Sequence, residues 1–203
     1  TNQVLCLDIS DIRNNNTDIV SSITSKATQT EDKWYDLAIS DMILFIFSDE
    51  ANATRIYGHI RDWNVSAVTD MSNAFKDRTT FNEDITGWDV SNVTNMRAIF
   101  QRATAFDQMI GEWNVASVIN MSWMFDGATS FNQVIKDWNI SAVTGMGFMI
   151  KKASSFNQDI GSWNVGSGND FDSMFVRASS FNQDIGSWDV SSGTNFFAMF
   201  ADA

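Results

Sequence analysis

The sequence predicts an α/β repeat solenoid in which each coil of about 25 residues holds a short strand and a short helical turn. The first observation is a run of tryptophans separated by 25 residues each: Trp63, Trp88, Trp113, Trp138, Trp163 and Trp188. The second is that other apolar residues recur at the same interval, and the third is an amphipathic helix ahead of them. We expect this helix to cap the first coil, because the terminal coil of a solenoid otherwise exposes its core.

The segment Ile-x-x-Trp-x-Val is expected to form the strand of each coil. Its apolar positions have the spacing of the leucine-rich-repeat strand, L-x-x-L-x-L, with tryptophan in the middle place. In Trp88-Asp89-Val90 the two apolar residues alternate about one polar residue, so both are expected to face inward. The helical turn is expected next, with Thr94 as its N-cap and one face formed by Met96, Ile99, Phe100 and Ala103.

Stacking of the coils is expected to bury these columns, because a single coil leaves its apolar side open above and below. A phenylalanine column runs in step, seven residues before the later tryptophans: Phe81, Phe106, Phe131, Phe156 and Phe181. Burying a large aromatic side chain contributes roughly 1.5–3 kcal/mol. The six tryptophans are therefore expected to form a structural core column rather than a ligand-stacking site.

Two segments carry a family resemblance: Phe181-Asn-Gln-Asp-Ile-Gly-Ser-Trp-Asp-Val190 and Trp88-Asp-Val-Ser-Asn-Val-Thr-Asn-Met96. They closely resemble the BspA-like leucine-rich repeats, a bacterial surface-protein repeat that is also abundant in some algae and protists. The resemblance covers roughly residues 56–203 and implies surface proteins used for adhesion and protein contacts, without catalysis. Glycines depart from the pattern in the later copies, at Gly145, Gly147, Gly168 and Gly193.

Three regions are expected along the chain. Residues 1–29 form a polar N-terminal segment, residues 30–55 hold the capping helix and its connection, and residues 56–203 form about six coils. The helix over 31–47 has Thr30 as its cap and an apolar stripe that includes Trp34 and Phe45. The alternative is a partner-binding helix. The chain stops at Ala203 without a polar cap, so this end is expected either to continue into further coils or to contact a partner.

Composition and charge disfavour several function classes. The formal net charge of −12 argues against nucleic-acid binding, which needs a basic face. The most apolar run, Met42 to Phe47, is far shorter than the ~20 residues of a transmembrane helix. With one histidine, His59, and one cysteine, Cys6, we expect no enzyme, no resident metal and no cofactor. Broken carboxylate columns leave weak calcium binding open.

Two rows of charged residues are candidate interaction sites. Acidic side chains are expected beside the strand, at Asp62, Asp89, Glu112 and Asp137. A basic row is expected past the helical turn, at Arg102, Lys152 and Arg177. This row is expected to be a solvated rim, and its functional alternative is a docking edge for an anionic partner or a lipid surface. A column of Asn82, Asp107, Asn132, Asn157 and Asn182 is expected to bond the loop backbone.

These observations predict a non-enzymatic interaction or adhesion module that presents a rigid repeat face to a protein partner. The alternative is a structural accessory subunit of a larger assembly. The corresponding locations are the extracellular space or cell surface, and an organellar or membrane-associated assembly with this chain as a peripheral subunit. Glycosylation sequons at Asn15 and Asn52, outside the repeats, are compatible with secretion.

Overall fold

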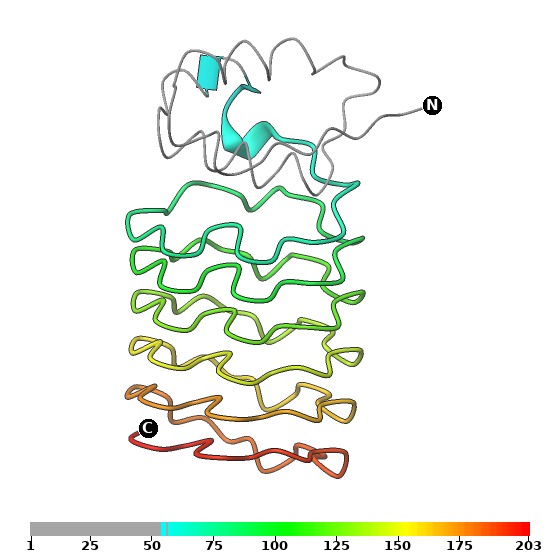
Figure 1. Cartoon of the computed structure of the whole chain (residues 1–203), viewed down its shortest axis with the longest axis vertical. Coiled ribbons are helices and arrows are strands. Elements are labelled where there is room, and N and C mark those ends of the chain that lie inside the picture. Colours follow the sequence, from blue (N-terminus) through cyan, green and yellow to red (C-terminus); the bar gives the residue numbers. More distant parts are fainter. Residues whose placement is uncertain (1–53, 56) are drawn as a thin grey trace, which may run out of the picture. The chain divides into compact units, whose positions relative to one another are not determined.

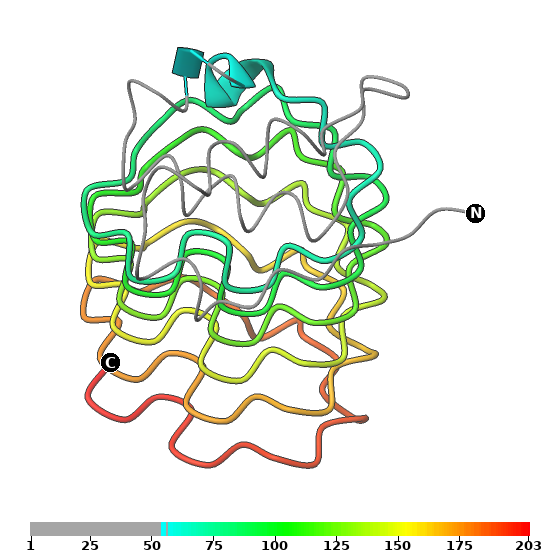
Figure 2. The ribbon, with the colours of Figure 1, turned by 45° about the horizontal axis from the view of Figure 1, so that its top comes forward.

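The computed structural model describes residues 54, 55 and 57–203. Within this part the chain runs in successive coils that lie one above another, from cyan to red in Figure 1. Figure 2 shows that consecutive coils follow nearly the same path. The one helix or strand with defined bounds in these residues is a 3₁₀ helix, η1 (Ile60–Asp62). His59 precedes it at the N-cap position and makes no side-chain capping hydrogen bond.

Neighbouring coils are joined by parallel backbone pairing with an offset of one repeat. Isolated parallel bridges link consecutive members of one column: Asp70, Asn95, Asn120, Gly145, Asp170 and Asn195. Beyond each bridge, alternate N–H groups donate to carbonyls of the next coil. At the first junction four amides donate over 2.8–2.9 Å, from Met71, Asn73, Phe75 and Asp77 to Asn95, Arg97, Ile99 and Gln101. Equivalent bonds recur at each later junction up to the sixth coil.

The structure differs from the expected helical turn after Thr94. Ala98 and Arg102 have φ of 56° and 58°, in the left-handed region, so a right-handed helix cannot pass through them. Alternate amides from Met96 to Arg102 are bonded to the next coil, and the amides between them close tight turns, as Ile99 does on the carbonyl of Met96. The hydroxyl of Thr94 donates to the carbonyl of Thr69 at 3.2 Å rather than capping a helix. The four residues of the expected apolar face are nonetheless buried: Met96, Ile99, Phe100 and Ala103.

The expected strand at Ile-x-x-Trp-x-Val is likewise absent among the described residues. The amide of Trp88 donates to the carbonyl of Ile85 at 3.2 Å, and the amide of Val93 donates to the carbonyl of Val90 at 2.9 Å. Each segment is therefore a succession of tight turns that directs the same apolar side chains inward. Assignment of this backbone to the leucine-rich-repeat class stays a prediction.

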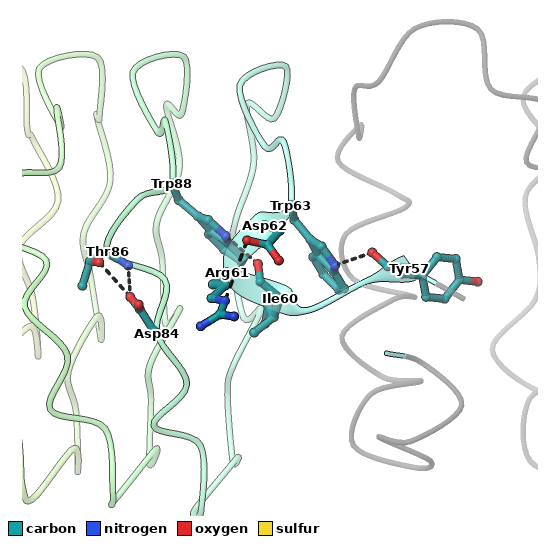
Figure 3. A network of polar contacts seen from close by, with 8 residues as sticks. All are labelled: Tyr57, Ile60, Arg61, Asp62, Trp63, Asp84, Thr86 and Trp88. Carbon is teal, nitrogen blue, oxygen red and sulfur yellow. Dashed lines mark hydrogen bonds and ion pairs between the residues drawn. The ribbon is translucent and has the colours of Figure 1, made fainter. Parts of the chain in front are cut away.

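The indole N–H groups join the coils through the core. All six tryptophans of the column are buried, with exposed fractions of 3–9%. In five of them Nε1 donates at 2.9–3.2 Å to an isoleucine carbonyl of the preceding coil, which belongs to Ile60, Ile85, Ile110, Ile135 or Ile160. Each of these carbonyls also accepts the backbone N–H of the tryptophan in its own coil, at 3.1–3.3 Å. Figure 3 shows the first such contact, from Trp88 to Ile60, and the contact from Trp63 to the carbonyl of Tyr57.

Two phenylalanine columns fill the rest of the layer beside the tryptophans. Along the column from Phe81 to Phe181, consecutive ring centroids are 5.8–6.1 Å apart and the rings are nearly parallel. The second column pairs with the first in four coils, as in Phe100 and Phe106 at 3.8 Å, and holds Ile150 in place of phenylalanine in another. Burial of one indole and two phenyl rings in most coils supplies the main apolar contribution to the stability of the stack.

Gly168 is explained by an exchange of volume between two core columns. Earlier coils hold valine and methionine at these positions, as in Val143 and Met146, whereas the fifth coil holds Gly168 and Phe171. A Cβ atom on Gly168 would lie 2.7 Å from Cζ of Phe171 and 2.3 Å from Cε of Met146. The phenyl ring therefore occupies the room that the valine side chain would need. The turn itself is kept, since the amide of Gly168 donates to the carbonyl of Val165 at 2.8 Å.

The expectations for the N-terminal part lie outside the described residues. They concern the polar segment 1–29, the helix over 31–47, Cys6 and the sequons at Asn15 and Asn52. In the last described coil, two phenylalanines that follow the core pattern are more exposed than their equivalents: Phe196 and Phe200, at 41% and 50%.

Trp113→Phe is expected to lower the free energy of unfolding by about 1–3 kcal/mol, because it removes an interior hydrogen bond and part of a buried ring. The lost bond is the one from Nε1 to the carbonyl of Ile85 at 3.2 Å. Urea denaturation followed by circular dichroism measures the change. Trp123→Phe is the matched control, since Trp123 is only partly buried and its indole N–H makes no hydrogen bond within the described residues. Equal losses in the two variants would contradict the role of the indole bond.

Gly168→Val alone is expected to destabilise the protein by about 1–3 kcal/mol through overpacking, and Phe171→Met alone by a similar amount through a cavity. The double variant recreates the valine and methionine pair of the earlier coils, so most of the loss is expected to be recovered. A double-mutant cycle of unfolding free energies measures the coupling, which is expected to exceed about 1 kcal/mol. Additive single losses would show that the two columns do not exchange volume.

Candidate functional site

The predicted acidic residues lie on the surface but do not converge. Asp62, Asp89, Glu112 and Asp137 are all exposed. The row that holds three of them is interrupted by Gly87, and Asp62 lies 3.8 Å from Nε of Arg61 (Figure 3). Among the described residues no group of three or more His, Cys, Asp or Glu side chains is arranged to hold a metal ion.

Asp89 belongs to a column whose side chains stabilise their own turns. Its Oδ1 accepts the backbone N–H of Ser91 at 3.1 Å, and the five equivalent residues make the same contact at 3.0–3.2 Å: Asn64, Asn114, Asn139, Asn164 and Asp189. Hydrogen bonds from the hydroxyl and the amide of Ser91 lower the pKa of Asp89. Asp84 is held in the same way by Thr86, whose hydroxyl and amide lower its pKa (Figure 3). These carboxylates are already committed to local structure.

The asparagine column bonds the loop backbone between coils, as predicted. Oδ1 of each member accepts the backbone N–H of the next member at 2.8–2.9 Å, along Asn82, Asp107, Asn132, Asn157 and Asn182. Glutamine side chains add bonds to the same residues, from Gln108 to Asn82, from Gln158 to Asn132 and from Gln183 to Asn157. The carboxylate of Asp107 replaces an amide in this column and keeps the bond to the backbone N–H of the next coil, because this contact needs only an acceptor oxygen.

The predicted basic row is partly neutralised. Arg102 makes a bidentate ion pair with Asp77 of the preceding coil, with Nη2 and Oδ2 2.9 Å apart. Arg177 contacts Asp202 of the following coil at 3.3 Å. Lys152 is exposed and has no ion pair among the described residues. Gly127 separates Arg102 from Lys152 in the row, so the structure does not bring the three predicted cations together.

An aromatic pair that the sequence analysis did not single out lies on the same side of the coils. The rings of Trp123 and Phe148 are stacked, with centroids 4.8 Å apart and planes 5° apart. The guanidinium of Arg97 lies 4.6 Å from the centroid of Trp123, and Nζ of Lys151 lies 4.7 Å from that of Phe148. The available signal was that Trp123 falls outside the 25-residue tryptophan column and is followed 25 residues later by Phe148.

Other exposed apolar side chains are scattered rather than grouped with this pair. Met109 and Val134 occupy successive places in a column that elsewhere holds Asp84, and they are 71% and 53% exposed. Ile119, at 50% exposed, belongs to a different column. No helix in the described part of the chain has the length and apolarity that a membrane crossing requires.

Arg102→Gln is expected to raise the pKa of Asp77 toward the ordinary aspartate value of about 3.9, because hydrogen bonds and charge from Arg102 lower it. The folded-state pKa is depressed, so the pair stabilises the protein above the unfolded-state pKa and loses this effect as pH falls through the folded-state value. A titration of the aspartate ¹³Cγ resonances measures it. Asp189, whose pKa is lowered by Ser191, is the internal control. An unmoved pKa for Asp77 would contradict the ion pair in solution.

Two overlapping segments of the chain, residues 15–133 and 108–203, match the family described as "Mycoplasma protein of unknown function, DUF285". Together they extend from residue 15 to residue 203 and so include most of the region ahead of the coils. No curated protein and no solved structure matches the chain. The chain belongs to the DUF285 family of Mycoplasma proteins of unknown function.

Proposed function

We propose that this chain is a non-enzymatic protein-interaction or adhesion module, in which stacked coils hold a fixed frame and the outward side chains select a partner. The observation that supports this proposal is the contrast between inner and outer columns of one chain. The column at Trp63 holds tryptophan in all six coils, the column at Ile60 holds isoleucine in all six, and the column at Val65 holds only valine or isoleucine. The column at Ser72 instead holds Ser, Arg, Ser, Gly, Asp and Phe in successive coils.

Rigid presentation supports the same function. Side-chain bonds between adjacent coils fix the loops, as in the acceptor column that begins at Asn82. A preorganised surface loses little conformational freedom when a partner binds, so more of the contact energy remains as affinity. Extracellular or cell-surface placement accords with the resemblance to BspA-like repeats and is part of the proposal.

A second candidate is a structural accessory subunit, carried as a peripheral member of an organellar or membrane-associated assembly. Met109 and Val134 favour it, because they are exposed apolar side chains in the same place of two consecutive coils, and adjoining apolar groups on a surface are suited to permanent contacts. In both candidates the partner is a protein.

Site-specific photo-cross-linking in intact cells tests the proposal. A benzophenone side chain would be placed singly at outward positions on different sides of the coils, at Asn73, Glu112, Lys136 and Lys152. A discrete protein adduct that forms at some of these positions and not at others is expected. Adducts with secreted or surface proteins favour adhesion, whereas adducts with fixed subunits of one complex favour the accessory role. No position-dependent adduct at any site would contradict both.

A further inference from the structure

One side of the coils is positively charged in an otherwise acidic molecule. We define the turn flank as residues 72, 73, 76 and 77 and their equivalents at 25-residue intervals up to residue 202. None of these side chains belongs to the contiguous hydrophobic cluster, and four of them are buried: Ala98, Gln101, Ser122 and Ser173. The turn flank carries six Lys or Arg against four Asp or Glu, whereas the rest of residues 51–203 carries four against twelve. Cations are thus concentrated on this side, although the chain as a whole has a negative net charge.

The stacked pair of Trp123 and Phe148 lies on the turn flank and has cations on its rings. Arg97 and Phe148 both lie over the Trp123 ring, at 4.6 Å and 4.8 Å from its centroid. Two groups at these distances cannot share one face of an indole, so they cover its opposite faces. The rings are partly exposed, and the part of the indole left for a ligand is its edge.

The fold does not require aromatic residues at these two positions. Trp123 and Phe148 have φ of 59° and 62°, and every member of their column adopts the left-handed region, including Asn73, Ala98 and Ser173. Asparagine and glycine adopt this conformation at least cost, whereas a bulky side chain is strained there. Strain that contributes nothing to the core is typical of a binding surface.

Three cations beside the aromatic pair remain available for an anionic partner. Arg97, Lys151 and Lys152 make no ion pair within the described residues, whereas Arg102 and Arg177 are matched by aspartates. In the row of Lys152, the preceding coil holds Gly127, which adds no side chain between Lys152 and Arg102 two coils away. A carboxylate of a partner that approaches Lys152 therefore meets no side chain at residue 127.

We propose that this patch, formed by Arg97, Trp123, Phe148, Lys151 and Lys152, binds an acidic linear segment of a partner protein. The inference rests on the proposed interaction function and specifies its site and chemistry. Carboxylates of the segment pair with the cations, and an apolar side chain between them packs on the aromatic edges. Covered indole faces disfavour sugar stacking. The aspartates interspersed along the turn flank disfavour an extended anionic membrane surface.

The spacing of the patch specifies the segment. Arg97 and Lys152 belong to coils two apart, which corresponds to about 10 Å along the stack, and they are also offset within the coil. An extended chain advances about 3.3 Å per residue and directs every second side chain the same way. Acidic residues at positions i and i+4 with an apolar residue at i+2 span about 13 Å and match this diagonal.

NMR titration of the full chain with the peptide Glu-Ser-Leu-Ser-Glu tests the proposal. The expected result is a saturable shift of the Trp123 indole N–H signal with a dissociation constant below about 1 mM. The matched peptide Gln-Ser-Leu-Ser-Gln is expected to bind at least ~10-fold more weakly, since it lacks the charges. The double variant Lys151→Gln/Lys152→Gln is expected to weaken binding at least ~5-fold.

Arg61→Gln/Lys136→Gln is the charge-matched control, because both residues are exposed and lie outside the turn flank. Its affinity for the acidic peptide is expected to stay within twofold of the wild-type value. Equal weakening in both double variants, or no shift at Trp123, overturns the proposal. Binding to phosphatidylserine vesicles without peptide binding overturns it in favour of a membrane surface. If the peptide fails while position-dependent adducts still form on another side of the coils, the interaction function stands and only this site is rejected.

Discussion

The bond from each indole N–H to an isoleucine carbonyl one coil earlier is the contact on which the stack depends. A leucine in the same place would bury less apolar area and would leave that carbonyl with only its own coil's amide. Tryptophan supplies a donor that reaches out of its own layer, so each ring both fills the core and fixes the turn below it. Because the acceptor sits at the corner where Ile85 or Ile110 begins a tight turn, the same bond sets the register between coils.

Because the register between coils is fixed, residues elsewhere in a coil can differ from coil to coil without a change in how the coils pair. The exchange of valine and methionine for Gly168 and Phe171 keeps the filled volume while altering which column supplies it. On the outside, Arg102 and Asp77 form an ion pair between adjacent coils, and this pair depends on the fixed spacing of those coils. A core that repeats from coil to coil and surface residues that differ between coils are properties expected of a repeat protein with a binding surface.

The sequence predicted which side chains are buried more reliably than it predicted the backbone that carries them. Met96, Ile99, Phe100 and Ala103 were assigned to one inward face, and all are buried. Three- and four-residue spacing fits a helix, but a run of tight turns with left-handed residues gives the same inward set. The left-handed conformation of Arg102, at φ of 58°, was hard to predict, because Gly127 is the one glycine among the six members of its column. The acceptor column from Asn82 was predicted correctly, since repetition of a short polar side chain between apolar columns has few other uses.

The candidate surface was harder to derive, for a different physical reason. The basic row was predicted from the recurrence of Lys and Arg at 25-residue intervals, and this spacing does not reveal that Arg177 contacts Asp202 in the next coil. Departure from the repeat was the better guide to the surface, as Trp123 and Phe148 illustrate. In a repeat protein the repeated residues build the frame, so the non-repeated ones carry the information about a ligand.

Pairing at a fixed offset has a consequence for how this chain can change in length. Every junction uses the same rows of amide donors and carbonyl acceptors, from Met71 with Asn95 to Phe171 with Asn195. Loss or gain of a whole 25-residue unit brings together rows that already match, whereas an insertion of one or two residues inside a coil displaces every contact above it. A gene encoding such a protein can therefore lengthen or shorten its product by unequal recombination, and each step would redraw the exterior while the interior stays intact.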